Sequence, residues 1–316
     1  MIYKITPEIK EYIWAGKKLK NKYNKNTDLE KISETWEFSI NESGLSQIGT
    51  QTLKEYMQNN PIGKNLKYED VKLLIKLIDS ASDLSIQVHP SDEYALKKYN
   101  KLGKTEMWYI IEAEKDAYLY LGFNDNYDKD TVLEHLKNGT ITDLLNKIYV
   151  KPGDFFKIPS GTIHAIGKGI TLYEIQENSD LTFRLYDYDR VDSNGNKREL
   201  HIDESIEVLN YNKYDLSYLN EKNESRIVTV NEYFELLKFF CKKSFTIKTN
   251  ESSFSILTII KGNPIINNQA FNLGDSIYVD PNETLKVDGD SEILLARIPD
   301  IAVGLDVGAH QFREWW

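Results

Sequence analysis

The stretch from Gly153 to His164 constrains the fold of this chain more than any other feature. It reads GDFFKIPSGTIH, an extended and mostly apolar run, a Pro-Ser-Gly turn, and a second run that opens on a histidine. Pro159 presets φ and Gly161 tolerates a positive φ, so a tight turn between two strands is expected. The stretch therefore predicts a β-hairpin whose second strand begins at His164.

This spacing resembles a signature motif of the cupin β-barrels, in which the histidine points into the barrel and binds a metal ion. A partner motif lies upstream. Gln87 and His89 are two residues apart at the end of the run Leu84–Val88, which reads as a strand, so their side chains share one strand face. Glu106 opens another apolar run, and Lys104 lies on the same face as Glu106.

Gln87, His89, Glu106 and His164 together offer a metal ion two nitrogens and two oxygens. Two imidazoles with a carboxylate and an amide oxygen suit Zn²⁺, and less specifically Mn²⁺, Fe²⁺, Co²⁺ or Ni²⁺. Each of these residues taken alone is compatible with a hydrogen-bonded structural role, so their co-occurrence carries the prediction. We expect one metal ion per chain inside an N-terminal β-barrel.

The composition is that of an ordinary globular protein with an acidic balance. The chain has 316 residues, 41% of them hydrophobic and 28% charged, and its formal net charge is -10. This charge, without a Lys/Arg-rich stripe, argues against nucleic-acid binding. The single cysteine, Cys241, excludes an intrachain disulfide and favours a reducing compartment. With no signal peptide and no apolar run of about 20 residues, we expect a cytoplasmic protein without membrane segments.

Turn and strand patterns predict a mainly β protein of two cupin barrels, a bicupin-like arrangement, with a few short helices. Helical spacing is found near residues 90–99, 129–147 and 201–209. The segment from Asn210 to Arg226 lacks periodicity and reads as a linker. We therefore expect a catalytic cupin domain over residues 1–225 and a C-terminal β domain over residues 226–316.

The C-terminal domain is predicted to be a degenerate barrel without metal ligands. Gly274 to Pro281 resembles the start of the motif at Gly153, but no histidine follows it. On periodicity alone an unrelated β-sandwich is equally compatible. The chain ends in Trp315 and Trp316, which we expect to pack on the barrel or on a neighbouring subunit. The oligomeric state is left open.

Several blocks of sequence, with their order preserved, resemble class I mannose-6-phosphate isomerase (phosphomannose isomerase) in its short bacterial form. The blocks cover residues 74–90, 103–109, 159–165 and 173–187. The resemblance spans roughly residues 1–210 and is more specific than a general cupin match. Larger members of that family carry a substantial helical domain, and here only the short helices near 129–147 stand in its place.

The resemblance implies a zinc enzyme that interconverts mannose 6-phosphate and fructose 6-phosphate. The family's metal ligands carry over to Gln87, His89, Glu106 and His164. The resemblance also implies functional roles for Lys104, Glu174 and Arg184, and it implies that Ser85 and Arg190 anchor the substrate phosphate. A hydroxyl and a guanidinium are suitable phosphate donors.

The chemistry of an aldose–ketose isomerase matches these residue types. A proton must move between C1 and C2 through an enediol(ate), which requires an electrophile, a base and a remote phosphate anchor. Zn²⁺ or the Arg184 guanidinium can stabilise the charge on oxygen. Glu174 and Lys104 are the candidate bases, and we expect a carboxylate inside a barrel to have a raised pKa. The sequence does not decide between the two bases.

Structural roles are also compatible with each of these residues. Arg184 has two acidic neighbours in sequence, Asp180 and Asp187, with which it could form a salt bridge. Glu174 could accept a hydrogen bond from a ligand histidine. Lys104 could be a solvated charge at a strand edge, and Arg190 an ordinary surface charge.

Two rival functional classes remain open at this point. One is another metal-dependent cupin enzyme, such as an oxygenase or a different sugar-phosphate isomerase. Oxygenases commonly use three histidines or a facial triad, whereas the first motif here is Gln-x-His. The other is a non-catalytic cupin that binds a sugar phosphate. Lys104, Glu174 and Arg184 are all present, which favours the enzyme.

Overall fold

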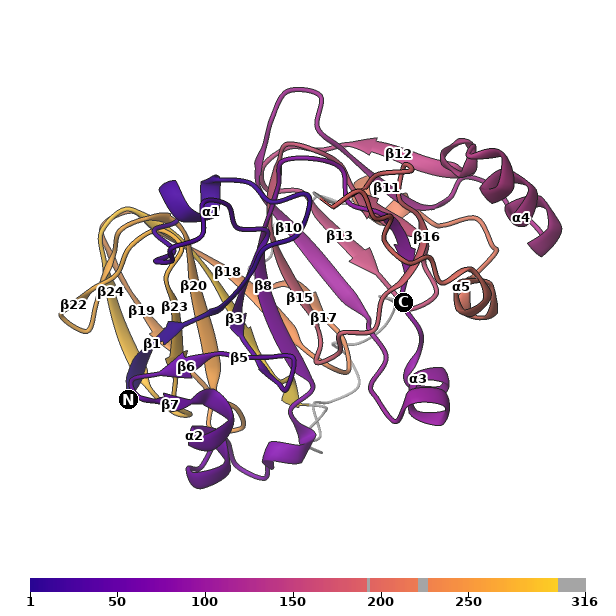
Figure 1. Ribbon diagram of the computed structural model, residues 1–316. Coiled ribbons are helices and arrows are strands. Elements are labelled where there is room, and N and C mark those ends of the chain that lie inside the picture. The colour runs from indigo at the N-terminus through magenta and orange to yellow at the C-terminus, as the bar shows by residue number, and fades with distance from the viewer. Residues whose placement is uncertain (192–193, 221–226, 301–316) are drawn as a thin grey trace.

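The computed structural model describes residues 1–191, 194–220 and 227–300. The predicted docking of Trp315 and Trp316 lies outside these residues. The described chain is mainly β, as predicted, and its antiparallel sheets are stacked in layers (Figure 1). None of its helices is long and apolar enough to cross a membrane, within the residues that the structure describes.

Two facing sheets form the N-terminal barrel. The inner sheet contains, in spatial order, β13 (Phe155–Ile158), β10 (Glu106–Ala113), β15 (Ile170–Glu177), β8 (Leu73–Ser80), β3 (Glu34–Phe38) and β2 (Glu8–Lys10). The outer sheet contains β12 (Leu145–Tyr149), β11 (Tyr118–Phe123), β14 (His164–Ile166), β9 (Ile86–Val88) and β16 (Phe183–Tyr186).

Two further sheets form the C-terminal barrel. The first contains β17 (Ile227–Val230), β18 (Glu235–Cys241), β25 (Ser291–Arg297), β20 (Ser255–Gly262), β23 (Ser276–Val279), β1 (Ile2–Thr6), β6 (Gln47–Ile48) and β7 (Gln51–Thr52). The second contains β19 (Ser244–Lys248), β24 (Thr284–Asp288), β21 (Ile265–Ile266) and β22 (Gln269–Ala270). A small hairpin, β4 (Ile40–Asn41) and β5 (Gly44–Leu45), lies apart from these sheets.

The two barrels repeat one strand order. In the N-terminal barrel, the strands β8 to β15 are divided between two sheets, with the spatial orders β13-β10-β15-β8 and β12-β11-β14-β9. The strands β18 to β25 form β23-β20-β25-β18 and β22-β21-β24-β19, which are the same two orders. The C-terminal region is therefore a second copy of the same barrel topology, and the internal repeat predicted from Gly274 is confirmed.

The inner sheet of the N-terminal barrel is buried on both faces, which explains its long apolar runs. Every residue of β8 and β15 is buried. On one face, Tyr109 and Ile175 pack in the same core as Ile256 of the C-terminal barrel. On the other face, Trp108 and Leu172 pack with residues of the outer sheet. The barrel interior, and the candidate site, lie on this second side.

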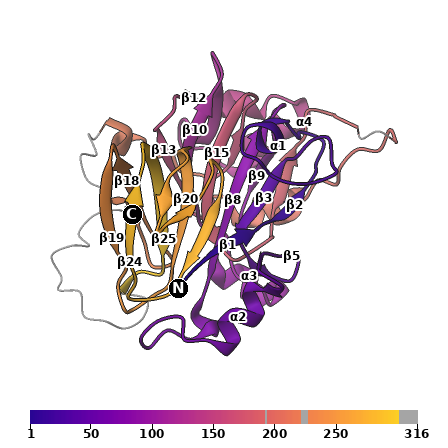
Figure 2. The ribbon, with the colours of Figure 1, turned by 90° about the vertical axis from the view of Figure 1, so that its left-hand side faces the viewer.

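The first strand of the chain belongs to the C-terminal barrel. Ile2 in β1 pairs with Val279 in β23, and Ile5 pairs with Ile48 in β6. Figure 2 shows the indigo β1 between the orange-to-yellow C-terminal strands and the purple strands of the inner sheet. Residues from both ends of the sequence thus complete one sheet, which joins the two barrels through a shared core.

The helices lie mainly on the outside of the barrels, and α3, α4 and α5 are on the right in Figure 1. The helices are α1 (Lys18–Asn21), α2 (Leu53–Asn59), α3 (Asp92–Tyr99), α4 (Lys129–Asn138) and α5 (Ile202–Val208), with 3₁₀ turns η1 (Tyr68–Asp70), η2 (Ile141–Leu144) and η3 (Ser217–Asn220). Val132 of α4 packs against Phe123 and Leu145 of the outer sheet. Helices α3, α4 and α5 therefore cover the outer face of the sheet that carries His164.

Of the two short helices predicted within 129–147, the first is confirmed by α4 and the second, expected up to about residue 147, was wrong. Asp128 caps the start of α4, and Gly139 ends this helix in a left-handed conformation with φ 69°. After η2, Leu145 pairs with Phe123 and begins β12. Pairing with the neighbouring strand overrides the helical pattern of residues 145–147. The predictions near 90–99 and 201–209 correspond to α3 and α5.

Candidate metal centre and substrate cavity

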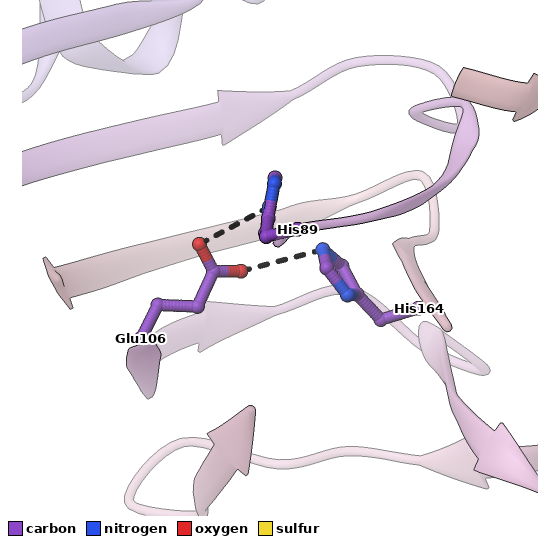
Figure 3. A group of neighbouring side chains, drawn as sticks. All are labelled: His89, Glu106 and His164. Carbon is purple, nitrogen blue, oxygen red and sulfur yellow. Dashed lines mark ion pairs between the residues drawn. The ribbon is translucent and has the colours of Figure 1, made fainter. Parts of the chain in front are cut away.

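His89, Glu106 and His164 bring three side chains together between the two sheets of the N-terminal barrel (Figure 3). His89 follows β9, Glu106 opens β10, and His164 opens β14. Each histidine Nε2 lies 3.4 Å from a different carboxylate oxygen of Glu106. The candidate ligand atoms all lie within 4.8 Å of one another, and all three residues are buried. The structure thus gathers three of the four predicted ligands.

Backbone carbonyls orient both histidines. His89 Nδ1 is 2.9 Å from the Leu181 carbonyl, and His164 Nδ1 is 2.9 Å from the Thr162 carbonyl. Because a carbonyl only accepts, each Nδ1 donates its proton outward and each Nε2 presents a lone pair toward Glu106. Burial lowers the pKa of both imidazoles, that of His164 to about 3. Both rings are therefore neutral, which is the form that binds metal ions.

Glu106 has an oxygen that the protein leaves unsatisfied. Its Oε1 is buried and has no hydrogen-bond partner among the described residues. Its Oε2 accepts from Lys104, whose Nζ is also 3.0 Å from His89 Nε2. An unsatisfied buried carboxylate oxygen is costly, and a divalent cation between it and two imidazoles would remove that cost. Two imidazoles and a carboxylate fit zinc.

Gln87, the fourth predicted ligand, lies beside this set. It pairs with His164 across the sheet, and its Nε2 is 3.2 Å from His164 Nε2. Its Oε1 lies 3.5 Å from the Ser85 hydroxyl. Exchange of the two ends of the amide would turn the oxygen toward the His–Glu set, where it could act as a further ligand.

A cavity of about 530 Å³ lies next to these residues and collects the other predicted site residues. Its walls include Ser85, Gln87, Lys104, Glu174 and Arg184. Lys104 is 4% exposed, so a solvated position at a strand edge is ruled out. The described lining does not include Arg190, but it includes Arg198.

Glu174 does not have the raised pKa expected from the sequence. Burial alone would raise its pKa, but Lys76 and Lys104 outweigh burial and hold the pKa well below its ordinary value. The Lys76 Nζ lies 3.1 Å from Glu174 Oε1, and Trp108 Nε1 donates to Oε2 at 2.9 Å. Glu174 is therefore an ionised carboxylate, and neither Lys76 nor Trp108 is a ligand histidine.

Arg184 lines the cavity with an unbalanced charge. Its Nη1 donates to the Glu199 carbonyl at 2.7 Å, and its Nε is buried without a partner among the described residues. Neither anticipated salt bridge is found in the described chain. Asp180 pairs instead with Lys101 at 2.7 Å, and Asp187 pairs with Arg190 and Arg198. Burial and the nearby Arg198 lower the pKa of Arg184.

Sequence reasoning missed several residues of the cavity wall. Lys76 is buried between Glu34 and Glu174, at 3.4 Å and 3.1 Å. Its signal was a charged residue with apolar neighbours on both sides in β8. Trp14, Trp36 and Arg198 also line the cavity, but they come from segments without a motif. Only their non-local packing brings them to the site.

Comparisons with known proteins agree with this geometry. A family model described as the catalytic domain of type I phosphomannose isomerase matches residues 2–118. The chain is 38% identical over 268 residues to the mannose-6-phosphate isomerase ManA of Bacillus subtilis (strain 168), which covers 81% of this chain and 84% of that relative.

Solved structures show the same architecture. A crystal structure of the mannose 6-phosphate isomerase from Bacillus subtilis matches with a TM-score of 0.86 and 32% identity, over 93% of this chain and 99% of that chain. A mannose 6-phosphate isomerase bound with zinc and yttrium matches with a TM-score of 0.73 and 16% identity, over 93% and 98% of the two chains.

Proposed function

Because the chain belongs to the type I phosphomannose isomerase family, we propose that it interconverts mannose 6-phosphate and fructose 6-phosphate with one zinc ion per chain. The ligands would be His89, Glu106 and His164, with Gln87 as the fourth. The observation that carries this proposal is the buried His–Glu–His set with its unsatisfied Glu106 oxygen, beside a cavity. The zinc-bound relative with the same fold supports the choice of metal.

The chemistry requires a Lewis acid, a charge-stabilising group and a base around carbons C1 and C2. Zinc, when bound, supplies a Lewis acid that polarises the substrate's carbonyl or hydroxyl oxygen. Neutral His89 and His164 keep their lone pairs available for it, because their Nδ1 protons are held by carbonyls. All three ligand residues are buried, so water has little access to the atoms that would bind the metal ion.

Arg184 would stabilise the negative charge of the enediolate. Its Nε is buried and has no hydrogen-bond partner among the described residues, so this donor would be available to the charge that develops on the enediolate oxygens. With no ion pair in the described chain, its guanidinium charge is not neutralised before substrate binds. A preorganised donor in a water-poor site has a larger effect on the transition state than a solvated one.

Lys104 and Glu174 would share the proton transfer between C1 and C2. Both side chains line the cavity, and Lys76 and Trp108 hold Glu174 in its ionised, proton-accepting form. Exchange of the substrate's carbon-bound hydrogen with deuterated solvent distinguishes the two candidate bases. The base is the residue whose replacement, Glu174→Gln or Lys104→Met, abolishes exchange at the substrate carbon while zinc content is retained.

A coupled assay tests the proposal. Purified, zinc-loaded protein should form fructose 6-phosphate from mannose 6-phosphate, and a chelator should remove this activity until zinc is restored. The proposal includes a cytoplasmic location, because a chain with one cysteine suits a reducing compartment. A zinc-loaded protein that binds the sugar phosphate without turnover would instead be a non-catalytic binding cupin. Turnover of a different sugar phosphate alone would assign another isomerase.

A further inference from the structure

The geometry assigns direct binding of the substrate phosphate to Arg198, with Arg190 acting as a positioning residue. This inference rests on the proposed function and names the recognition of the substrate's charged end. It concerns a cluster of Arg184, Arg190, Arg198 and Asp187 beside the cavity, which we call the arginine cluster. The two assigned arginines form a matched pair, because both contact Asp187 and both side chains are 22% exposed.

All three nitrogens of the Arg190 guanidinium contact the protein. Its Nε donates to the Asp187 carbonyl at 3.2 Å, its Nη2 to the Asp187 carboxylate, and its Nη1 to the Asp83 carbonyl. The group also lies over the Tyr188 ring. Arg190 thus clamps the segment after β16 onto the loop between β8 and β9, which also carries Ser85. It is not among the described residues that line the cavity.

Arg198 uses only one edge of its guanidinium. Its Nε donates to Asp187 Oδ2 at 2.8 Å and its Nη2 to Oδ1, a two-pronged contact that fixes the plane of the group. Its Nη1 has no hydrogen-bond partner in the described chain, and the side chain lines the cavity. Asp187 therefore holds Arg198 in place and leaves donors available for a ligand.

The charge of the arginine cluster favours an anion. Its members are three guanidiniums and one carboxylate, so two positive charges lack a partner within it. Asp180 also lines the cavity, but Lys101 pairs with it at 2.7 Å. A phosphate monoester carries nearly two negative charges and offers oxygens that accept from arginine in pairs. The uncompensated charge matches that ligand, and Ser85 adds a hydroxyl to the lining of the same cavity.

Equilibrium binding of mannitol 6-phosphate tests this assignment, because this reduced substrate keeps the phosphate but cannot isomerise. Calorimetry on zinc-loaded protein should show affinity roughly 10- to 100-fold weaker for Arg198→Met, the range for losing charged hydrogen bonds. Arg190→Met should weaken binding less than about threefold, because Asp187 still holds Arg198. Arg198→Lys keeps the charge and should recover part of the loss.

Kinetics on the same variants separates recognition from catalysis. For mannose 6-phosphate, Arg198→Met should raise KM by a similar factor and change kcat less than about threefold. Zinc content and thermal unfolding show whether each variant is folded, and Arg198→Lys replaces Arg198→Met if the latter is not. An Arg190→Met loss equal to or larger than that of Arg198→Met overturns the assignment. Wild-type binding of mannitol 6-phosphate without turnover would refute the proposed function and leave this anchor standing.

Discussion

The two barrels of this chain share a strand order and differ in what they enclose. The N-terminal barrel encloses buried charged and polar groups, among them His89, Lys104, Glu106, His164 and Glu174. The C-terminal barrel encloses an apolar cluster that includes Leu257, Ile259, Ile277 and Leu295. One scaffold therefore supports two interiors, and only the first brings metal-binding side chains together within the described residues.

Strand pairing identifies the equivalent positions. His164 lies eleven residues after Gly153 and pairs with Gln87, while Leu285 lies eleven residues after Gly274 and pairs with Ile247. Leu285 and Ile247 belong to the apolar cluster. By the same pairing, Glu106 opposite Ile158 corresponds to Ser255 opposite Val279. Aliphatic side chains thus fill the positions of His164 and Gln87.

The comparison teaches that the barrel does not require its polar interior. Burying charged groups costs free energy unless they are paired or bind a ligand, whereas aliphatic residues at the same positions stabilise the fold. The N-terminal barrel carries this cost, and its Glu106 Oε1 has no hydrogen-bond partner among the residues that the structure describes. Such departures from an apolar core are expected at functional sites.

The largest effect is expected from making the first barrel resemble the second. His164→Leu places at the metal set the residue type that occupies the equivalent position 285. We expect loss of zinc binding and a fall in kcat/KM of more than about a thousandfold, because the Lewis acid and its orientation are lost together. Thermal unfolding should show a folded protein. Zinc retained by this variant would contradict the proposal that His164 is a metal ligand and that position 285 is its apolar equivalent.

A change at the equivalent position of the second barrel should lower the stability of the protein and leave the zinc content unchanged. Leu285→Ala removes a fully buried side chain, and we expect the free energy of unfolding to fall by about 2–5 kcal/mol. Denaturant unfolding measures this loss, and elemental analysis should still give the wild-type zinc content. Loss of zinc from folded Leu285→Ala would show that the two interiors are not independent.

A substitution of Arg184 tests whether the polar side chains of the first barrel take part in catalysis. Arg184→Lys keeps a positive charge but loses the planar donor, whose Nε is buried without a partner in the described part of the chain. We expect normal folding and zinc content, with kcat reduced by roughly two orders of magnitude or more. A raised KM with unchanged kcat would assign Arg184 to ground-state binding. Unchanged kcat and KM would remove it from the mechanism.

The smallest effect concerns the pH dependence of stability that buried polar groups introduce. Burial, reinforced by Asp92, raises the pKa of Glu177 from 4.5 to about 8, against a hydrogen bond from the Thr105 N–H. Lys72, which pairs with Asp92, and Tyr233 also face this pair. Between pH 4.5 and about pH 8 the folded protein holds a proton that the unfolded chain has released. The free energy of unfolding therefore falls as pH rises through this window.

Glu177→Gln should flatten that decline, because an amide of the same shape cannot titrate. The measurement is urea unfolding of both proteins at several pH values from about 5 to about 9, where the difference should favour the variant increasingly as pH rises. Parallel curves for the two proteins would mean that Glu177 does not carry the pH dependence.

The sequence predicted what depends on local spacing. The motif around Gly153–His164 and the Gln87/His89 alternation predicted the mainly β fold. With Glu106 they also predicted the three residues that the structure brings together at the candidate metal centre. The repeat at Gly274 predicted the second barrel, although the pairing of β1 with β23 was not foreseen because it joins the two ends of the chain.

The features that could not be predicted from the sequence depend on contacts between residues that are far apart along the chain. The pKa of Glu174 was predicted in the wrong direction because Lys76, on the neighbouring strand β8, pairs with it only after folding. The second short helix, expected up to about residue 147, is instead the 3₁₀ turn η2 followed by strand β12, because Leu145 pairs with Phe123. Arg198 reaches the cavity from an irregular segment after β16, and no periodicity or motif marks it.

Stepwise zinc addition to metal-free protein tests the central claim most directly, with turnover of mannose 6-phosphate measured at each point. We predict that activity rises linearly and reaches a plateau at about one zinc per chain. The variant His89→Ala/His164→Ala should take up no stoichiometric zinc and remain inactive. Full turnover by the metal-free protein, or one zinc per chain retained without either histidine, would contradict the account.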